Sequence, residues 1–149
     1  MDIIESLRIA MRKRIFAAEI IPPEHYQEEF KNVPDEVGNS YYVRETVIDM
    51  GRIEPNQTSE LQTVLCEYDV IVSEGWLNPT VTASNIVEKI RSEFNVKKPD
   101  KINITLSDQP ETQAWVREPV TTAAAEQDSG WYRLPVFVYI ECLIRSQGA

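Results

Sequence analysis

The stretch "GWYRLPVFVYIECLIRSQ", residues 130–147, alternates between two kinds of side chain. Every second residue from Tyr132 to Ile144 is apolar or aromatic, whereas the residues between them, from Trp131 to Arg145, mix aromatic rings with charges. A period of two predicts a strand with one face in the core, about 50 Å long if it is unbroken. Because most strands hold about five or six residues, this closing strand is longer than the core of a small domain needs.

The composition is that of a single globular domain. The chain has 149 residues, of which 42% are hydrophobic and 26% charged. These values predict one domain, residues 1–149, with a modest core. No apolar run approaches the roughly 20 residues that cross a bilayer, and the first residues lack the basic and apolar blocks of a signal peptide. We therefore expect an intracellular protein.

Apolar spacing along the rest of the chain predicts two helices and three further strands. The expected helices cover residues 2–19 and about 79–94, the second with Asn78 as its N-cap. The expected strands cover residues 41–53, 61–74 and 102–107, and the first two form a hairpin across residues 54–60. This order predicts an α+β fold, an antiparallel sheet with helices packed on one face and a long C-terminal strand.

Two long connections separate these elements and hold most of the net charge of −9. Residues 22–40 carry five acids against Lys31, and residues 107–130 carry five acids against Arg117, so each segment has a net charge of −4. Such segments disfavour binding of nucleic acid, which needs cations to replace its counterions. Solvated loops are often acidic, so the charge alone assigns no function. Pairing of part of residues 107–130 with a neighbouring strand stays open.

Few side chains suit catalysis or metal binding. Cys66 and Cys142 lie on the expected core faces of two strands and are predicted to be buried free thiols. His25 lies in the acidic, proline-flanked connection and is predicted to be a surface loop residue. Because no Cys or His accompanies it at ligand spacing, we predict no zinc site.

The sequence contains no strong catalytic motif. The five glycines do not form a phosphate-binding loop, and there is no nucleophile elbow or zinc-protease pattern. Glu67 and Asp69 alternate on a strand face that is predicted to be solvated, where acid–base catalysis is a poor expectation. We therefore predict no enzyme activity, no cofactor and no metal. A small hydrolase or ligand-binding domain with a carboxylate site remains the alternative from another class.

The second face of the closing strand has the composition of a protein–protein interface, in which aromatic residues and Arg are common. The predicted subunit contacts are Trp131, Phe137 and Tyr139 on this face and Trp115 in the connection 107–130. The alternative is that the second helix covers one face of the sheet and the long connection the other, which leaves no interface.

The order of segments also resembles a known family. An N-terminal helix and an acidic connection precede "YYVRETVIDMGR", "LQTVLCEYDVIVSEGW", "NPTVTASNIVEKIRSEF", "INITLS" and "GWYRLPVFVYIECLIR". This layout is similar to that of the tail-terminator proteins of long-tailed bacteriophages, the lambda-type terminators. The resemblance covers essentially the whole chain and rests on layout and strand character, while the long segment 107–130 departs from it.

The resemblance implies a structural virion protein without enzymatic activity. Such a protein forms a homohexameric ring at the head-proximal end of the tail tube, ends tube polymerisation and joins the tail to the neck. It implies other copies, the tail tube protein and neck proteins as partners, with DNA passing through the lumen without specific binding, and no membrane. It implies a location in the virion tail, and in the host cytoplasm during assembly.

Two further expectations depend on this resemblance. The acidic connections are candidates to line the lumen, through Glu28, Glu29, Asp35, Glu36, Glu126 and Asp128. A neck or tail-completion protein, which joins head to tail in the same particle, is the alternative within structural proteins.

Overall fold

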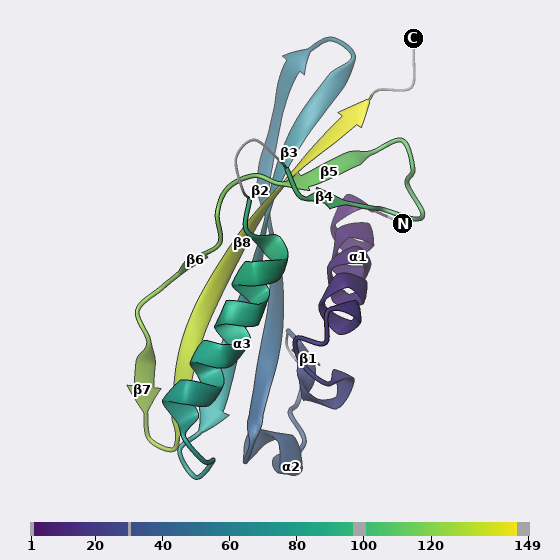
Figure 1. The fold of residues 1–149 in the computed structure, drawn as a ribbon. Helices are drawn as coiled ribbons and strands as arrows, with labels where there is room; N and C mark the ends of the chain where they lie inside the picture. The colour runs from purple at the N-terminus through teal and green to yellow at the C-terminus, as the bar shows by residue number, and fades with distance from the viewer. Residues whose placement is uncertain (1, 30, 97–100, 146–149) are drawn as a thin grey trace.

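The computed structural model describes residues 2–29, 31–96 and 101–145. These residues form one curled sheet with the strand order β1-β2-β3-β8-β5-β4, and β6 and β7 also pair with β8 (Figure 1). The strands are β1 (Tyr26–Glu28), β2 (Tyr41–Asn56), β3 (Ser59–Ser73), β4 (Asn103–Ile104), β5 (Gln113–Val116), β6 (Thr121–Thr122), β7 (Glu126–Asp128) and β8 (Trp131–Arg145). The helices are α1 (Ile3–Ala17), the 3-10 turn η1 (Pro23–His25), α2 (Asp35–Gly38) and α3 (Pro79–Phe94).

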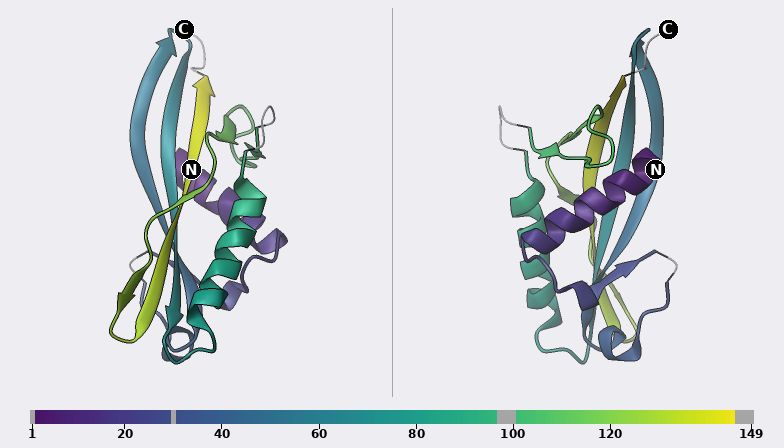
Figure 2. Two further views of the ribbon diagram at one scale, coloured as in Figure 1. Left: turned by 60° about the vertical axis from the view of Figure 1, so that its left-hand side comes forward. Right: turned by 90° about the vertical axis from the view of Figure 1, so that its right-hand side faces the viewer.

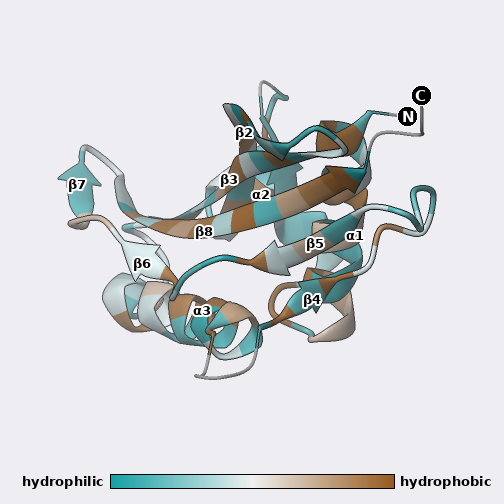
Figure 3. Cartoon of the chain, turned by 90° about the horizontal axis from the view of Figure 1, so that it is seen from above, coloured by the Kyte–Doolittle hydropathy of each residue, from teal (hydrophilic) through white to brown (hydrophobic). Residues whose placement is uncertain are grey.

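The expected fold class, an antiparallel sheet with helices packed on one face, is wrong. The structure is mostly β, with 43% strand and 27% helix. The sheet is mixed, because β1 runs parallel to β2. It also curls into a half-barrel, and α1 and α3 lie in the hollow of this curve instead of forming a layer on a flat sheet (Figures 2 and 3). Long strands twist, and the twist accumulates across neighbouring strands into this curl.

The closing strand and the hairpin before it are confirmed. β8 pairs with β3 over its whole length, from Trp131 opposite Ser73 to Arg145 opposite Ser59. β3 pairs on its other side with β2, as the expected hairpin. The inward residues of the middle of β8 are fully buried, as the period of two predicted: Val136, Val138, Ile140 and Cys142. The three long strands form the paired centre of the domain.

The connection 107–130 contains three short strands that explain the length of β8. β5, β6 and β7 each pair with β8 in antiparallel register, one after another along its second edge. β8 is therefore a central strand, paired on one side with β3 and on the other with these three strands. The expectation that part of β8 is surplus to its own domain is wrong. The predicted strand 102–107 shortens to β4, which pairs with β5.

The two long helices fill the hollow of the sheet. α1 buries Leu7, Met11 and Ile15, and α3 buries an equivalent stripe that ends in Phe94. Asn78 is the residue before α3, as predicted, but its side chain makes no capping hydrogen bond. Its backbone is left-handed, with φ of 50°, a conformation that Asn adopts more readily than most residues.

Candidate functional site

The outer face of the sheet, opposite α1 and α3, holds all four aromatic residues predicted to contact another subunit. Trp131, Phe137 and Tyr139 alternate along β8 with its buried inward residues, and each is half-buried. Trp115 lies in β5, a strand and not a loop, opposite Glu141 of β8. Because its neighbours on either side in β5 are buried, its ring points outward too. The structure brings these residues onto one surface, and their contact with a neighbour stays a prediction.

Two of these aromatic rings have a cationic side chain of the same chain lying over them. The guanidinium of Arg117 lies 5.3 Å from the ring centroid of Tyr139. The Nζ of Lys101 lies 4.7 Å from the ring centroid of Trp115. Such cation–π contacts hold a ring in place while its remaining surface stays accessible. The outer face therefore presents ordered aromatic rings rather than loose ones.

The acidic residues predicted to line a lumen come from three elements. Glu28 lies in β1, next to Glu29, and a hydrogen bond from Lys31 lowers its pKa. Asp35 and Glu36 form the first turn of α2. The remaining two are the exposed residues Glu126 and Asp128 of β7. Figure 1 shows α2 and β7 at the same end of the molecule, where β8 begins. Acids from both connections thus gather at one end of the long sheet, and a lumen position for them stays a prediction.

Between α2 and β7 the outer face is hollowed into a groove of about 500 Å³, the outer groove. Its base is formed by outward residues of β2, β3 and β8, and its sides by residues 38–39 after α2 and residues 129–131 at the turn into β8. That turn depends on Gly130, whose φ of 92° is one that other residues rarely adopt. Two arginines, Arg44 of β2 and Arg133 of β8, face the groove.

Arg133 is held by three carboxylates. Its Nη2 lies 3.1 Å from both carboxylate oxygens of Asp69, and its Nη1 lies 2.9 Å from Glu126. Glu67 is further away, at 3.7 Å. Burial opposes the charge of Arg133, but the hydrogen bond to Asp69 acts in the other direction and its pKa is raised. Burial, and then the charge of Asp69, raise the pKa of Glu67.

This cluster corrects the expectation that Glu67 and Asp69 are simply solvated. Asp69 is buried, and Glu67 is partly so. The sequence contains the two acids at alternate positions, but it does not reveal that the register of β3 against β8 brings Arg133 next to them.

Arg44 differs from Arg133 in having no carboxylate partner among the described residues. Its Nε is buried without a hydrogen-bond acceptor in the described part of the chain. Its guanidinium carbon lies 5.8 Å from the ring centroid of Tyr42. Asp69 lies opposite Arg44 in the β2–β3 register, but both of its oxygens bind Arg133. A buried donor without an acceptor costs about 1–3 kcal/mol, more for a charged group. Nε itself is closed to water, so what lines the groove is the rest of a guanidinium that has no carboxylate beside it in the described structure.

Exposed apolar side chains occur in two groups at opposite ends of the sheet. One group, Ile48, Met50 and Ile53, lies on residues 48–60, which we call the β2–β3 arm. The arm projects beyond the helices and the short strands (Figures 1 and 2), with β8 paired to its β3 side as far as Ser59. The other group, Trp76, Leu77 and Val81, lies at the start of α3. Since β1 pairs only with residues 43–45 of β2, the outer edge of the arm has no strand beside it in the described structure. The sequence predicted the hairpin but not that its tip leaves the core.

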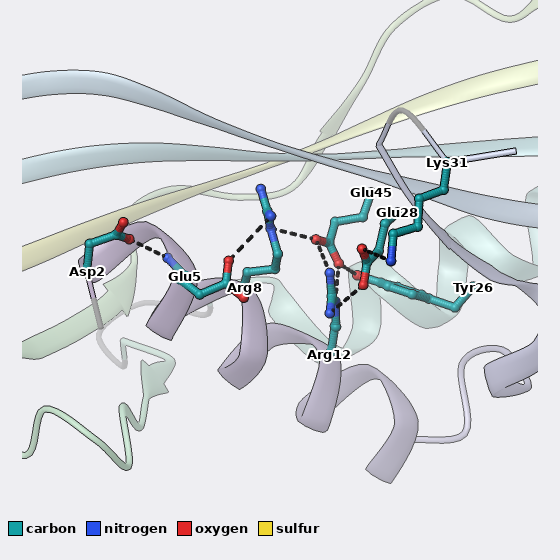
Figure 4. A network of polar contacts seen from close by, with 8 residues as sticks. All are labelled: Asp2, Glu5, Arg8, Arg12, Tyr26, Glu28, Lys31 and Glu45. Carbon is teal, nitrogen blue, oxygen red and sulfur yellow. Dashed lines mark hydrogen bonds and ion pairs between the residues drawn. The ribbon is translucent and has the colours of Figure 1, made fainter.

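A second charged cluster lies on the inner side of the sheet, around Glu45 of β2 (Figure 4). Arg12 of α1 donates from Nε and Nη2 to the two Glu45 oxygens, at 2.7 and 3.0 Å. The Nε of Arg8 lies 2.9 Å from Oε1 as an ion pair, but its N–H makes no aligned hydrogen bond. The hydroxyl of Tyr26 also donates to Glu45, and burial raises the pKa of this tyrosine.

The Glu45 cluster attaches α1 and β1 to β2, and all of its contacts are internal. The side chain of Glu45 is 2% exposed, so it is not open to a ligand. The alternation of Val43, Glu45 and Val47 was visible in the sequence and marked an inward-facing acid, a signal that the sequence analysis missed.

The remaining candidates for chemistry are occupied or buried. Cys66 and Cys142 are buried free thiols, as predicted, and burial raises their pKa values to about 12 and about 11. His25 was expected to be a surface loop residue, but it is half-buried at the end of η1. Its Nδ1 lies 2.7 Å from the carbonyl oxygen of Tyr41, and its ring stacks on the Tyr41 ring at 4.3 Å.

The described residues contain no group of three His, Cys, Asp or Glu side chains placed to hold a metal ion. None of their helices has the length and apolar character needed to span a membrane.

Comparison with known proteins shows the fold and nothing further. No protein-family model matches the chain, and no curated protein does. A solved structure, known only by a sequence code that states no function, matches with a TM-score of 0.65 and 14% identity, over 93% of this chain and 94% of that chain. At this identity the likeness concerns architecture alone, so the half-barrel with helices in its hollow is shared with another protein of similar extent.

Proposed function

We propose that this chain is a structural protein that assembles into a closed ring at the head-proximal end of a phage tail tube. There it ends tube polymerisation and joins the tail to the neck. The observation that carries this proposal is the pair of unlike exposed apolar surfaces at opposite ends of one long sheet, the β2–β3 arm and the group around Leu77. The order of elements, which resembles that of tail terminators, supports the same function.

Unlike surfaces on one chain favour head-to-tail contacts. A contact between two different surfaces leaves one of each free, so copies add until the rotation closes a ring. Exposed apolar side chains that gather into a patch are a feature of interaction sites, unlike those scattered singly over a surface. The three long strands provide a stiff frame on which both surfaces keep a fixed separation, as a ring of fixed size requires.

The acidic end of the molecule fits a channel for DNA. α2 and β7 bring four exposed acids to that end: Asp35, Glu36, Glu126 and Asp128. Phosphates within about 10 Å of such a surface are repelled at ordinary ionic strength. A ring with this end toward its lumen would let DNA pass without binding it.

The test is to grow tail tubes from purified tube protein with and without this chain, and to image them by negative-stain electron microscopy. We expect tubes to stop lengthening and to carry a ring at one end. Tubes that lengthen at an unchanged rate and carry no added density would contradict the proposal. Binding to neck proteins with no effect on tubes would favour the neck-protein alternative.

A ligand-binding domain is a second candidate because of the outer groove, where Arg44 has no acceptor in the described structure. A chain that stays monomeric beside tubes and neck proteins, and that binds a small anion in this groove, would favour that class.

A further inference from the structure

We propose that the outer groove receives the tip of the β2–β3 arm of a second copy, with Arg44 donating to the carboxylate of Glu54 from that copy. The inference rests on the proposed function in one respect, since both require head-to-tail contacts between copies. It goes further in naming the outer groove, which lies at the same end of the sheet as the group around Leu77, as the surface that receives the arm. It also names the charged pair that joins them.

The first step is that Arg44 needs an acceptor from outside its own chain. Seven arginines form ion pairs with acids of the same chain: Arg8, Arg12, Arg14, Arg52, Arg91, Arg117 and Arg133. Arg44 and Arg145 have no such partner among the described residues. Arg145 is exposed to water at the end of β8, whereas Arg44 is half-buried and its Nε is shielded from water. The Nε of Arg8 is also buried without an aligned hydrogen bond, but it has the ion pair with Glu45. Among the described arginines, Arg44 combines a shielded Nε with the lack of any ion pair.

The second step concerns shape. The outer groove is concave, so a group that reaches Arg44 must project from its own molecule. The arm is the element that projects, as both views of Figure 2 show. The arm turns at residues 56–59, where Asn56 pairs with Ser59. Close to this turn lie Ile53, which is 66% exposed, and Glu54, which is exposed and forms no ion pair with any described residue.

The third step excludes the arm of the same chain. Arg44 and Glu54 are about ten residues apart on one continuous strand, which places them about 30 Å from each other. The long register of β2 against β3 holds the strand extended over most of this distance. The arm therefore reaches a groove only on another molecule, and the two copies are displaced along the strand direction.

The fourth step is chemical fit. The apolar side chains of the arm face a groove whose lining includes Tyr42, Ile71 and Trp131, the aromatic and aliphatic groups common at interface centres. The carboxylates near Arg133 are already engaged by it, so Arg44 is the cation left for Glu54.

The test exchanges the two charges. Arg44→Glu and Glu54→Arg are each made alone and are also mixed in equal amounts, and association is followed by sedimentation velocity. Each single variant places like charges in contact, so we expect its association to weaken at least about tenfold. In the mixture every arm meets a groove of opposite charge, and association should recover. Lys89→Glu, on the exposed side of α3, changes the net charge as Arg44→Glu does and should leave association unchanged.

Circular dichroism melts confirm that each variant is folded. If Arg44→Glu is not, Arg44→Gln and Glu54→Gln replace the reversals, and each should then weaken association. If the wild-type chain associates only with tail tubes, the comparison is made there. The inference is overturned if the wild-type chain associates neither alone nor with tubes, if Arg44→Glu behaves like Lys89→Glu, or if the mixed variants fail to recover. A ring that caps tubes but ignores both reversals would overturn this contact and leave the proposed function standing. If the reversals abolish association but the wild-type chain has no effect on tubes, this contact stands and the proposed function is overturned.

Discussion

Glu45 shows what a single buried charge does in this fold. It is an acid at an inward position of β2, and it is tolerated because Arg8, Arg12 and Tyr26 surround it. A buried ion pair adds little stability compared with an apolar pair, but removal of one member leaves the others without a partner. The cluster therefore makes the docking of α1 specific, since only one placement of the helix satisfies all of these groups.

Glu45→Gln should lower the free energy of unfolding by about 3 kcal/mol, near the low end for a broken buried pair because both arginines keep some exposure. Denaturant titration measures it. Glu60→Gln is the control, since its pair with Arg52 is exposed and should cost at most about 1 kcal/mol. Equal losses in the two variants would show that the inner cluster has no special role.

For single residues, the sequence predicted which face of a strand a side chain lies on, but not which side chains it contacts. The alternation in β3 and β8 correctly placed Cys66 and Cys142 in the core. It could not reveal that Asp69 meets Arg133 or that Glu45 meets Arg12, because the partners lie 64 and 33 residues away in the chain. Only the register of the strands and the docking of α1 bring them together.

Among the elements, β8 is the one on which most of the others depend. It pairs with β3 along its whole length and serves as the template for β5, β6 and β7. Those strands have two to four residues, too few for a period of two to be recognised. They are held by backbone pairing with β8 and not by their own pattern, which is why the segment 107–130 resembled a loop in the sequence.

The outer face of β8 provides a prediction at this scale. Phe137→Lys should block assembly, because it places a charge among the aromatic residues predicted to contact another subunit. The monomer should stay folded, because the ring is only half-buried on the outer face and Glu67 lies opposite it in register to accept the new charge. Size-exclusion chromatography measures assembly, and far-UV circular dichroism measures folding. Ser84→Lys, at an exposed position of α3, is the control. An unchanged oligomer in Phe137→Lys would remove Phe137 from the interface.

For the whole molecule, the curl of the sheet was the feature that sequence patterns could not predict. Alternation identifies an inward and an outward face, but curvature depends on how twist accumulates over the paired strands. The bulge between Asp49 and Arg52 is another feature of register that bends a strand locally. The consequence is a half-barrel with an arm at one end and an acidic, grooved surface at the other, two different ends on one rigid frame.

The central claim is that these two ends join copies of the chain head to tail into a closed ring. Native mass spectrometry of the purified chain over a range of micromolar concentrations, alone and with tail tubes, tests it most directly. The account predicts a single closed oligomer, six copies if the terminator resemblance holds, or a monomer that forms this oligomer only with tubes. A chain that remains a monomer in every one of these conditions would contradict it.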